Sequence, residues 1–253
     1  MLESTGRFGQ EGYEMALKGI LLVTLFVLTV AAGVGQIHAA PSFSGTSKQA
    51  VFLSPIERWM PTWDLNAYVS PLERAGYHVD VLLNENVSIA FLRTGLAKYD
   101  IIILRTESYA YEGFDYYCSG EPVTKARTEF SAEISAKELL VGPCVGFSIL
   151  FLKDSYPANS LHYAFVYAVG STTAALSSAF LSAGAAMFIG FYDEHSLQWG
   201  RIDSFSEKLF YYLAQGYTVN DAIIRLNRYI YTGHGSTADW PMLYCSGDGT
   251  FQI

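Results

Sequence analysis

The most constraining feature of this sequence is an alternation of short apolar runs with helix-like segments between residues 50 and 108. The runs AVFLS, HVDVLL and DIIILRTES have the length and composition of buried strands, and the segments 62–77 and 88–99 between them carry apolar residues at helical spacing. This order is typical of a parallel sheet with right-handed crossovers. We therefore predict an α/β fold with a mainly parallel central sheet. Pro71 should kink the first helix or restart it.

The alternation stops after residue 108 and resumes at residue 162. HYAFVYAVG and AMFIGFY predict a fourth and a fifth strand, with a helix over 172–185 between them. Two further helices are expected over 201–216 and 218–233, and WPMLYCSGDGTFQI should form an edge strand or a hairpin. The segment 109–161 reads as a hairpin-rich insertion of short strands with one short helix, of the kind that builds a substrate wall or a lid.

Composition limits the class of protein. The chain has 253 residues, of which 51% are hydrophobic and 16% charged, so it can bury a sizeable core. Its net charge of −8 argues against a nucleic-acid partner, because phosphate binding needs a concentrated basic face. We predict one folded domain over residues 41–253 and leave its oligomeric state open.

The first forty residues form a separate segment. The apolar run 19–35 follows Lys18 and precedes QIHAAPS, which together have the pattern of a secretory signal cleaved after Ala39 or Ala40. An uncleaved membrane anchor is the alternative, since the run is near the lower length for spanning a bilayer. If translation starts at Met15, the segment matches the pattern of a secretory signal more closely. Either way, we expect an extracytoplasmic domain that contacts a membrane only through this segment.

Export affects how the three cysteines are interpreted. Cys118 and Cys144 lie in the same irregular region and are the preferred disulfide pair, which would leave Cys245 over, although spacing alone does not settle the pairing. The spacing of Cys and His fits no zinc site, and we expect no cofactor. Asn86 begins the sequon Asn-Val-Ser and is a candidate glycosylation site.

Candidate functional residues follow the predicted strands. The carboxyl ends of parallel strands share one rim, where ligands bind in α/β folds. A carboxylate, hydroxyl groups and an Asp/Glu/His cluster should converge there. The residues at the rim are Arg105, Glu107 and Ser108 from the third strand, Gly170, Ser171 and Thr172 from the fourth, and Asp193, Glu194 and His195 from the fifth.

Several stretches resemble the caspase/gingipain-like cysteine peptidases and their extracytoplasmic CHAT-type relatives. They are FLRTGLAKYDIIILRTES, SGEP, HYAFVYAVGSTTAALSSAFLSAGAAMFIGFYDE and the terminal SGDGTFQI, and the resemblance covers most of residues 50–253. It implies a three-layer sandwich. In those peptidases a His ends the third strand and a Cys ends the fourth, and the thiolate attacks the scissile carbonyl.

Both residues of that dyad are replaced in this chain. The His position falls on Glu107, and the Cys position falls on Ser171, or on Val169 if the alignment slips by two residues. A carboxylate with an ordinary pKa of about 4.3 is a weak base for a serine hydroxyl. The resemblance therefore implies a peptidase homologue without peptidase activity, whose rim binds a peptide or protein partner.

Two functions from other classes remain open. An active hydrolase could use Ser171 with His195 or with Glu107. A surface domain could instead bind Ca²⁺ or Mg²⁺ through Asp193, Glu194 and Glu107, since carboxylate oxygens are the usual ligands of these ions.

Simpler structural interpretations compete with each functional one. Ser171 or Thr172 could be the N-cap of the following helix, and Glu107 could pair with Arg105 or cap a loop. A histidine in a loop, such as His234, or beside a strand, such as His78 and His162, more often has a structural place than a catalytic one.

Overall fold

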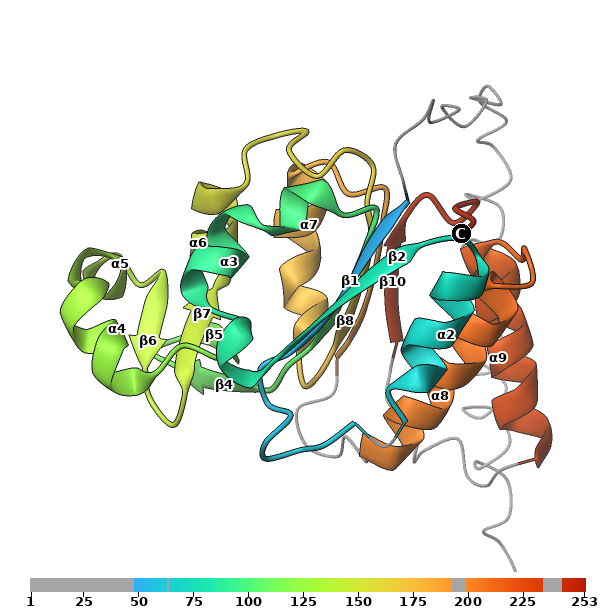
Figure 1. Cartoon of the computed structure of the whole chain (residues 1–253), viewed down its shortest axis with the longest axis horizontal. Coiled ribbons are helices and arrows are strands. Elements are labelled where there is room, and N and C mark those ends of the chain that lie inside the picture. Colours follow the sequence, from blue (N-terminus) through green and yellow to red (C-terminus); the bar gives the residue numbers. More distant parts are fainter. Residues whose placement is uncertain (1–47, 63, 193–198, 234–242) are drawn as a thin grey trace, which may run out of the picture. The chain divides into compact units, whose positions relative to one another are not determined.

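The computed structural model describes residues 48–62, 64–192, 199–233 and 243–253, apart from the side chains of residues 228–233. A six-stranded sheet forms its centre, with the strand order β10-β9-β8-β3-β1-β2 (Figure 1). All neighbouring pairs are parallel except β9 and β10, which are antiparallel. The α/β class with a mostly parallel sheet is thus confirmed. The strands are β1 (Gln49–Ser54), β2 (His78–Leu83), β3 (Ile101–Arg105), β8 (Phe165–Val169), β9 (Met187–Phe191) and β10 (Leu243–Gly247).

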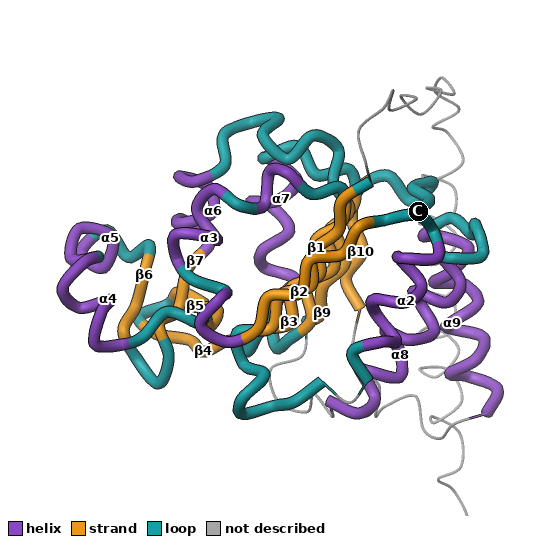
Figure 2. Tube along the Cα trace, viewed as in Figure 1, coloured by secondary structure: helices purple, strands orange, loops and turns teal. Residues whose placement is uncertain are grey.

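Helices cover both faces of this sheet (Figures 1 and 2). Successive side chains in a strand point to opposite faces, so Ile102 and Leu104 of β3 pack on one helical layer while Ile101 and Ile103 pack on the other. The first layer consists of α3 (Ile89–Thr94), α6 (Ile149–Ser155) and α7 (Ser177–Ser182). The second consists of α2 (Asn66–Arg74), α8 (Trp199–Leu213) and α9 (Val219–Gly233).

The chain between β3 and β8 builds a second, antiparallel sheet of order β4-β5-β7-β6. Its strands are β4 (Ser108–Tyr111), β5 (Phe114–Cys118), β6 (Leu139–Val141) and β7 (Val145–Ser148), with α4 (Val123–Glu129) and α5 (Ser131–Ser135) between β5 and β6. The expectation of one short helix in this segment was wrong. It contains α4, α5 and α6, and α6 belongs to the main sandwich because Phe151 and Leu152 are buried against that core.

Three of the expected helices differ in detail. Helix α2 continues through Pro71 and is not restarted there. The segment 88–99 divides into α3 and the 3₁₀ turn η2 (Leu96–Lys98), and the segment after β8 begins with the 3₁₀ turn η3 (Thr173–Leu176) before α7. A short 3₁₀ turn (η1, Asn84–Asn86) follows β2.

No helix in the described parts of the chain is both long enough and apolar enough to cross a membrane. The apolar run 19–35 lies outside those parts.

Candidate functional site

The carboxyl ends of β3 and β8 bring Glu107 and Ser171 together. These strands are parallel neighbours, with Arg105 aligned to Val169, so the residues that follow each strand meet at the same edge. The Ser171 hydroxyl donates a hydrogen bond to Glu107 Oε1 over 2.7 Å, and both side chains are partly exposed. Two residues separated by 64 positions in sequence therefore form one polar pair at the rim of the sheet.

Further hydroxyl groups surround this pair. Ser108 Oγ donates to the carbonyl oxygen of Ser171 over 2.8 Å and lies 2.9 Å from Thr172 Oγ1. The Tyr117 hydroxyl donates to the carbonyl oxygen of Thr172 over 3.0 Å. Burial raises the pKa of Tyr117 well above its ordinary value, so this phenol stays a neutral donor. We call Glu107, Ser108, Ser171 and Thr172 the rim cluster.

The turn after β8 requires glycine. Gly170 has a φ of +149°, and a Cβ at this position would lie 1.9 Å from the carbonyl oxygen of Thr106. Thr173 stabilises the turn from the other side, because its hydroxyl donates to the carbonyl oxygen of Ala168 and accepts from the N–H of Phe191. The backbone that presents Ser171 is therefore fixed by contacts to both neighbouring strands.

The N-cap interpretation of Ser171 and Thr172 is wrong. Thr172 precedes η3 in a left-handed conformation with a φ of +51°, and its side chain makes no capping hydrogen bond. An N-cap residue needs an extended backbone to bring its side-chain oxygen back to the first free N–H groups. The Ser171 hydroxyl instead points to Glu107, and the Thr172 hydroxyl to Ser108.

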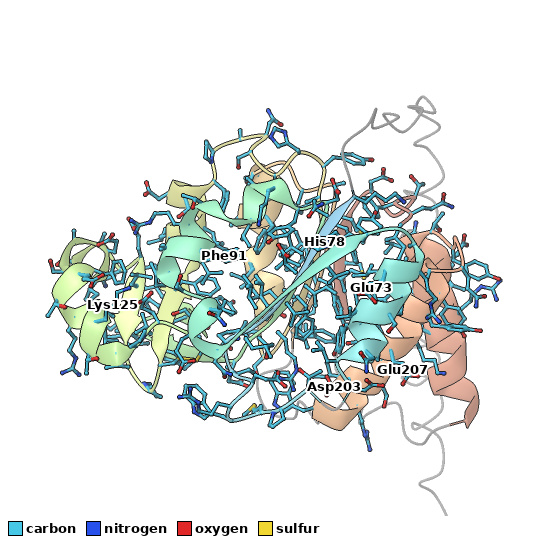
Figure 3. The ribbon with its side chains drawn as sticks, in the orientation of Figure 1. Glu73, His78, Phe91, Lys125, Asp203 and Glu207 are labelled. Carbon is cyan, nitrogen blue, oxygen red and sulfur yellow. A yellow bond between two sulfur atoms is a disulfide. The ribbon has the colours of Figure 1, made fainter. Side chains whose placement is uncertain are left out.

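Arg105 does not belong to the rim cluster, and the predictions that it binds at the rim or pairs with Glu107 were wrong. Its side chain follows Ile101 and Ile103 to the face covered by α2, α8 and α9, and it is fully buried. Its guanidinium donates to the carbonyl oxygens of Met60 and Pro61. It also lies 3.6 Å from Asp203 Oδ1 and 4.4 Å from the centre of the Trp199 ring. Asp203 belongs to α8 and is labelled in Figure 3.

The remaining predicted rim residues, Asp193, Glu194 and His195, lie outside the described residues, as does His234. His78 and His162 both stand at the amino ends of strands, opposite the rim cluster. The described part of the chain contains no group of three or more His, Cys, Asp or Glu side chains that could hold a metal ion.

A disulfide joins Cys118 to Cys144 beside the rim cluster, 26 positions apart in sequence. The N–H of Cys118 donates to the carbonyl oxygen of Glu107 over 2.9 Å, so the disulfide is attached directly to the chain that carries this carboxylate. Cys245 is free and exposed on β10. The side chain of Asn86 is exposed, and the Ser88 hydroxyl of its sequon caps α3 by accepting from the N–H of Phe91.

A pocket of about 210 Å³, which sequence reasoning did not find, borders the disulfide. Its lining residues come from the segments 55–59, 84–85, 119–123 and 143–144, and we call it the rim pocket. The first two segments follow the carboxyl ends of β1 and β2, so the pocket opens at the same edge of the sheet as the rim cluster. No sequence signal identifies it, because its four segments meet only in the folded chain.

The described geometry offers hydroxyl groups and one carboxylate that can exchange hydrogen bonds, with a pocket at the same edge of the sheet. It brings no imidazole to Ser171 within the described residues. No protein-family model and no curated protein matches this chain. The geometry of the site is therefore the main indication of its function.

Proposed function

We propose that this protein is an exported, caspase/gingipain-like domain that has lost peptidase activity and binds a peptide or protein partner at the carboxyl rim of its sheet. The observation that carries the proposal is the hydrogen bond between Ser171 and Glu107. These residues occupy the ends of two adjacent parallel strands, where the resembling peptidases hold their Cys and His. In this chain the two positions hold a hydroxyl and a carboxylate that bind each other.

The topology supports the resemblance. The third and fourth of the predicted strands, β3 and β8, are neighbours in the sheet, and the GD pair Gly247–Asp248 lies at the end of the antiparallel edge strand β10. The second sheet lies between β3 and β8 in sequence, in the segment 109–161 where the interrupted alternation predicts an insertion. The disulfide agrees with an oxidising compartment, which together with the apolar run 19–35 motivates the extracytoplasmic part of the proposal.

The chemistry of the pair argues against catalysis. Acyl transfer by serine needs a base that takes the hydroxyl proton and later delivers it to the leaving group, which an imidazole does well. A carboxylate is a weak base towards a serine hydroxyl, because the serine oxygen holds its proton far more tightly than a carboxylate would. The Ser171–Glu107 hydrogen bond therefore orders the rim and does not activate a nucleophile.

The same cluster suits a peptide ligand. Extended peptides present alternating N–H and C=O groups, and hydroxyl groups can donate to the one and accept from the other. Ser108, Thr172 and the Glu107 carboxylate are partly exposed on the rim. A bound backbone can therefore exchange hydrogen bonds with water for hydrogen bonds with these groups at little cost.

A peptide library displayed on phage and selected on the full chain tests the proposal. Selected peptides should bind without being cleaved, and Glu107→Gln or Ser171→Val should weaken binding at least tenfold. Ser178→Ala, an exposed serine on α7, is the matched control and should leave binding unchanged. Selected peptides whose binding is indifferent to both rim variants would contradict the proposal.

One alternative, a serine hydrolase that uses Ser171 with His195 or Glu107, makes the opposite prediction about labelling of Ser171. A fluorophosphonate probe separates the two. The proposed function predicts no labelling, whereas labelling of the wild type that is lost in Ser171→Ala would establish an active hydrolase.

A further inference from the structure

The rim pocket has the size of one side chain. Its volume of about 210 Å³ lies below the range of about 300–1,000 Å³ typical of sites for cofactors and drug-sized ligands. The disulfide links it to the rim cluster, because Cys144 lines the pocket and the N–H of its disulfide partner Cys118 donates to the carbonyl oxygen of Glu107. A peptide that crosses the rim cluster can therefore place a side chain in this pocket.

Several polar groups of the lining already have partners. The N–H of Gly120 donates to the carbonyl oxygen of Val87, and the N–H of Arg58 donates to Asn84 Oδ1. The buried Glu121 carboxylate accepts from Lys125 Nζ at 2.8 Å and from the N–H of Ile89 at 3.0 Å. An occupant would gain few hydrogen bonds here, so its affinity must come mainly from apolar burial.

The rest of the lining is apolar and rigid. Pro55, Pro122 and Pro143 contribute rings that carry no N–H, and Val123 adds a branched side chain. Trp59 leaves 58% of its surface exposed beside them. A flat ring can pack between the proline rings and contact the indole, and aromatic pairs are stabilised beyond the effect of the area they bury.

The charges at the pocket balance. Arg58 and Glu85 form an exposed ion pair, and Glu121 is paired with Lys125. The main-chain N–H of Glu85 and the Arg58 guanidinium lower the pKa of Glu85, so its carboxylate stays ionised in that pair. A charged occupant would meet no unbalanced charge of opposite sign and would lose hydration on entry, so a neutral occupant is favoured.

We propose that the rim pocket is a subsite for an aromatic side chain of the peptide bound at the rim cluster. This inference rests on the proposed function and adds that the bound peptide contains an aromatic residue. The bound peptide is extended across the rim, with one aromatic residue seated against Trp59.

Nuclear magnetic resonance titration of the full, ¹⁵N-labelled chain tests the subsite with N-acetyl-phenylalanine amide as the probe. The indole N–H signal of Trp59, assigned by its loss in Trp59→Phe, should shift in a saturable manner. N-acetyl-glutamate amide and N-acetyl-lysine amide should shift it at least tenfold less at equal concentration. Trp59→Ala should weaken a selected peptide at least tenfold, whereas Tyr211→Ala, which removes a similarly exposed ring from α8, should not.

Three results would overturn the inference: a response of the Trp59 signal to charged probes as strong as that to the phenylalanine probe, a stronger response to N-acetyl-proline amide, or no response at all. The two proposals can fail separately. If peptide binding needs Glu107 and Ser171 but is unchanged in Trp59→Ala, the proposed function is supported and the subsite is contradicted. If the Trp59 signal shifts in a saturable manner with the phenylalanine probe but no peptide binds at the rim cluster, the pocket's aromatic preference is supported and the proposed function is contradicted.

Discussion

The two ends of the parallel strands, which we call the amino edge and the carboxyl edge of the main sheet, differ in what covers them. At the amino edge, residues 248–253 fold back over the strands, and the Phe251 ring stacks on Phe165 with 5.5 Å between centroids. Asp248 accepts hydrogen bonds there from Thr250 and from the Tyr163 hydroxyl. At the carboxyl edge the rim cluster keeps partly exposed hydroxyl groups and a carboxylate beside an open pocket.

This difference separates an edge covered by packed side chains from one with accessible polar groups. The chain's own end occupies the amino edge with aromatic packing, so that edge contributes to stability. The carboxyl edge instead holds polar groups in fixed positions through a glycine turn and a disulfide, at a place where α/β folds commonly bind ligands. Substitutions at the two edges should therefore separate effects on binding from effects on stability.

The largest effect should come from Gly170→Ala at the carboxyl edge. Backbone strain costs about 1–3 kcal/mol and overpacking against Thr106 costs a similar amount, so the free energy of unfolding should fall by about 4 kcal/mol. Gly113→Ala is the control: its φ is +82°, but nothing lies within 4 Å of the added Cβ, and it should cost about 1–2 kcal/mol. Urea unfolding of both variants measures this, and equal losses would contradict the close approach at Gly170.

Removal of the disulfide should have the next largest effect. The double variant Cys118→Ser/Cys144→Ser releases a loop of 26 positions, which by chain entropy lowers the free energy of unfolding by about 3.5 kcal/mol. Cys245→Ser is the matched control and should change stability by less than about 0.5 kcal/mol, because the free cysteine is exposed. Calorimetry in the absence of reductant should show a lower melting temperature for the double variant alone. A similar loss for Cys245→Ser would show that the lower stability of the double variant does not come from the disulfide bond.

The smallest effect should be a pH-dependent one at the amino edge. Hydrogen bonds from Thr250 and then from Tyr163 lower the pKa of Asp248 below its ordinary value of 3.8. The folded state therefore favours the ionised carboxylate, and this stabilisation is complete above the unfolded pKa and disappears as the pH falls through the folded pKa. Asp248→Asn should cost about 0.5–1 kcal/mol at pH 7 and progressively less below pH of about 4. Urea unfolding across this range measures the difference, and a cost that stays constant to about pH 2 would show that the carboxylate charge has no role.

Much of the fold could be predicted from local pattern. Short apolar runs separated by helical periodicity identify β1, β2, β3, β8 and β9, and the strand length fixes where each one ends. The placement of Glu107 and Ser171 at one edge follows, since parallel strands share their carboxyl ends. The segment 109–161 was less predictable, because its strands have only three to five residues and gain their stability from pairing with each other.

By itself, the sequence determined the α/β class, the strands and the residues that end them, since these depend on apolar periodicity and on residues close together in the chain. Only the tertiary structure decided which partners those residues have. Arg105 and Glu107 are two positions apart, yet one is buried against Asp203 and the other meets Ser171 at the rim. The physical reason is that strand order and register bring distant residues together, and no local pattern records which distant group will be there.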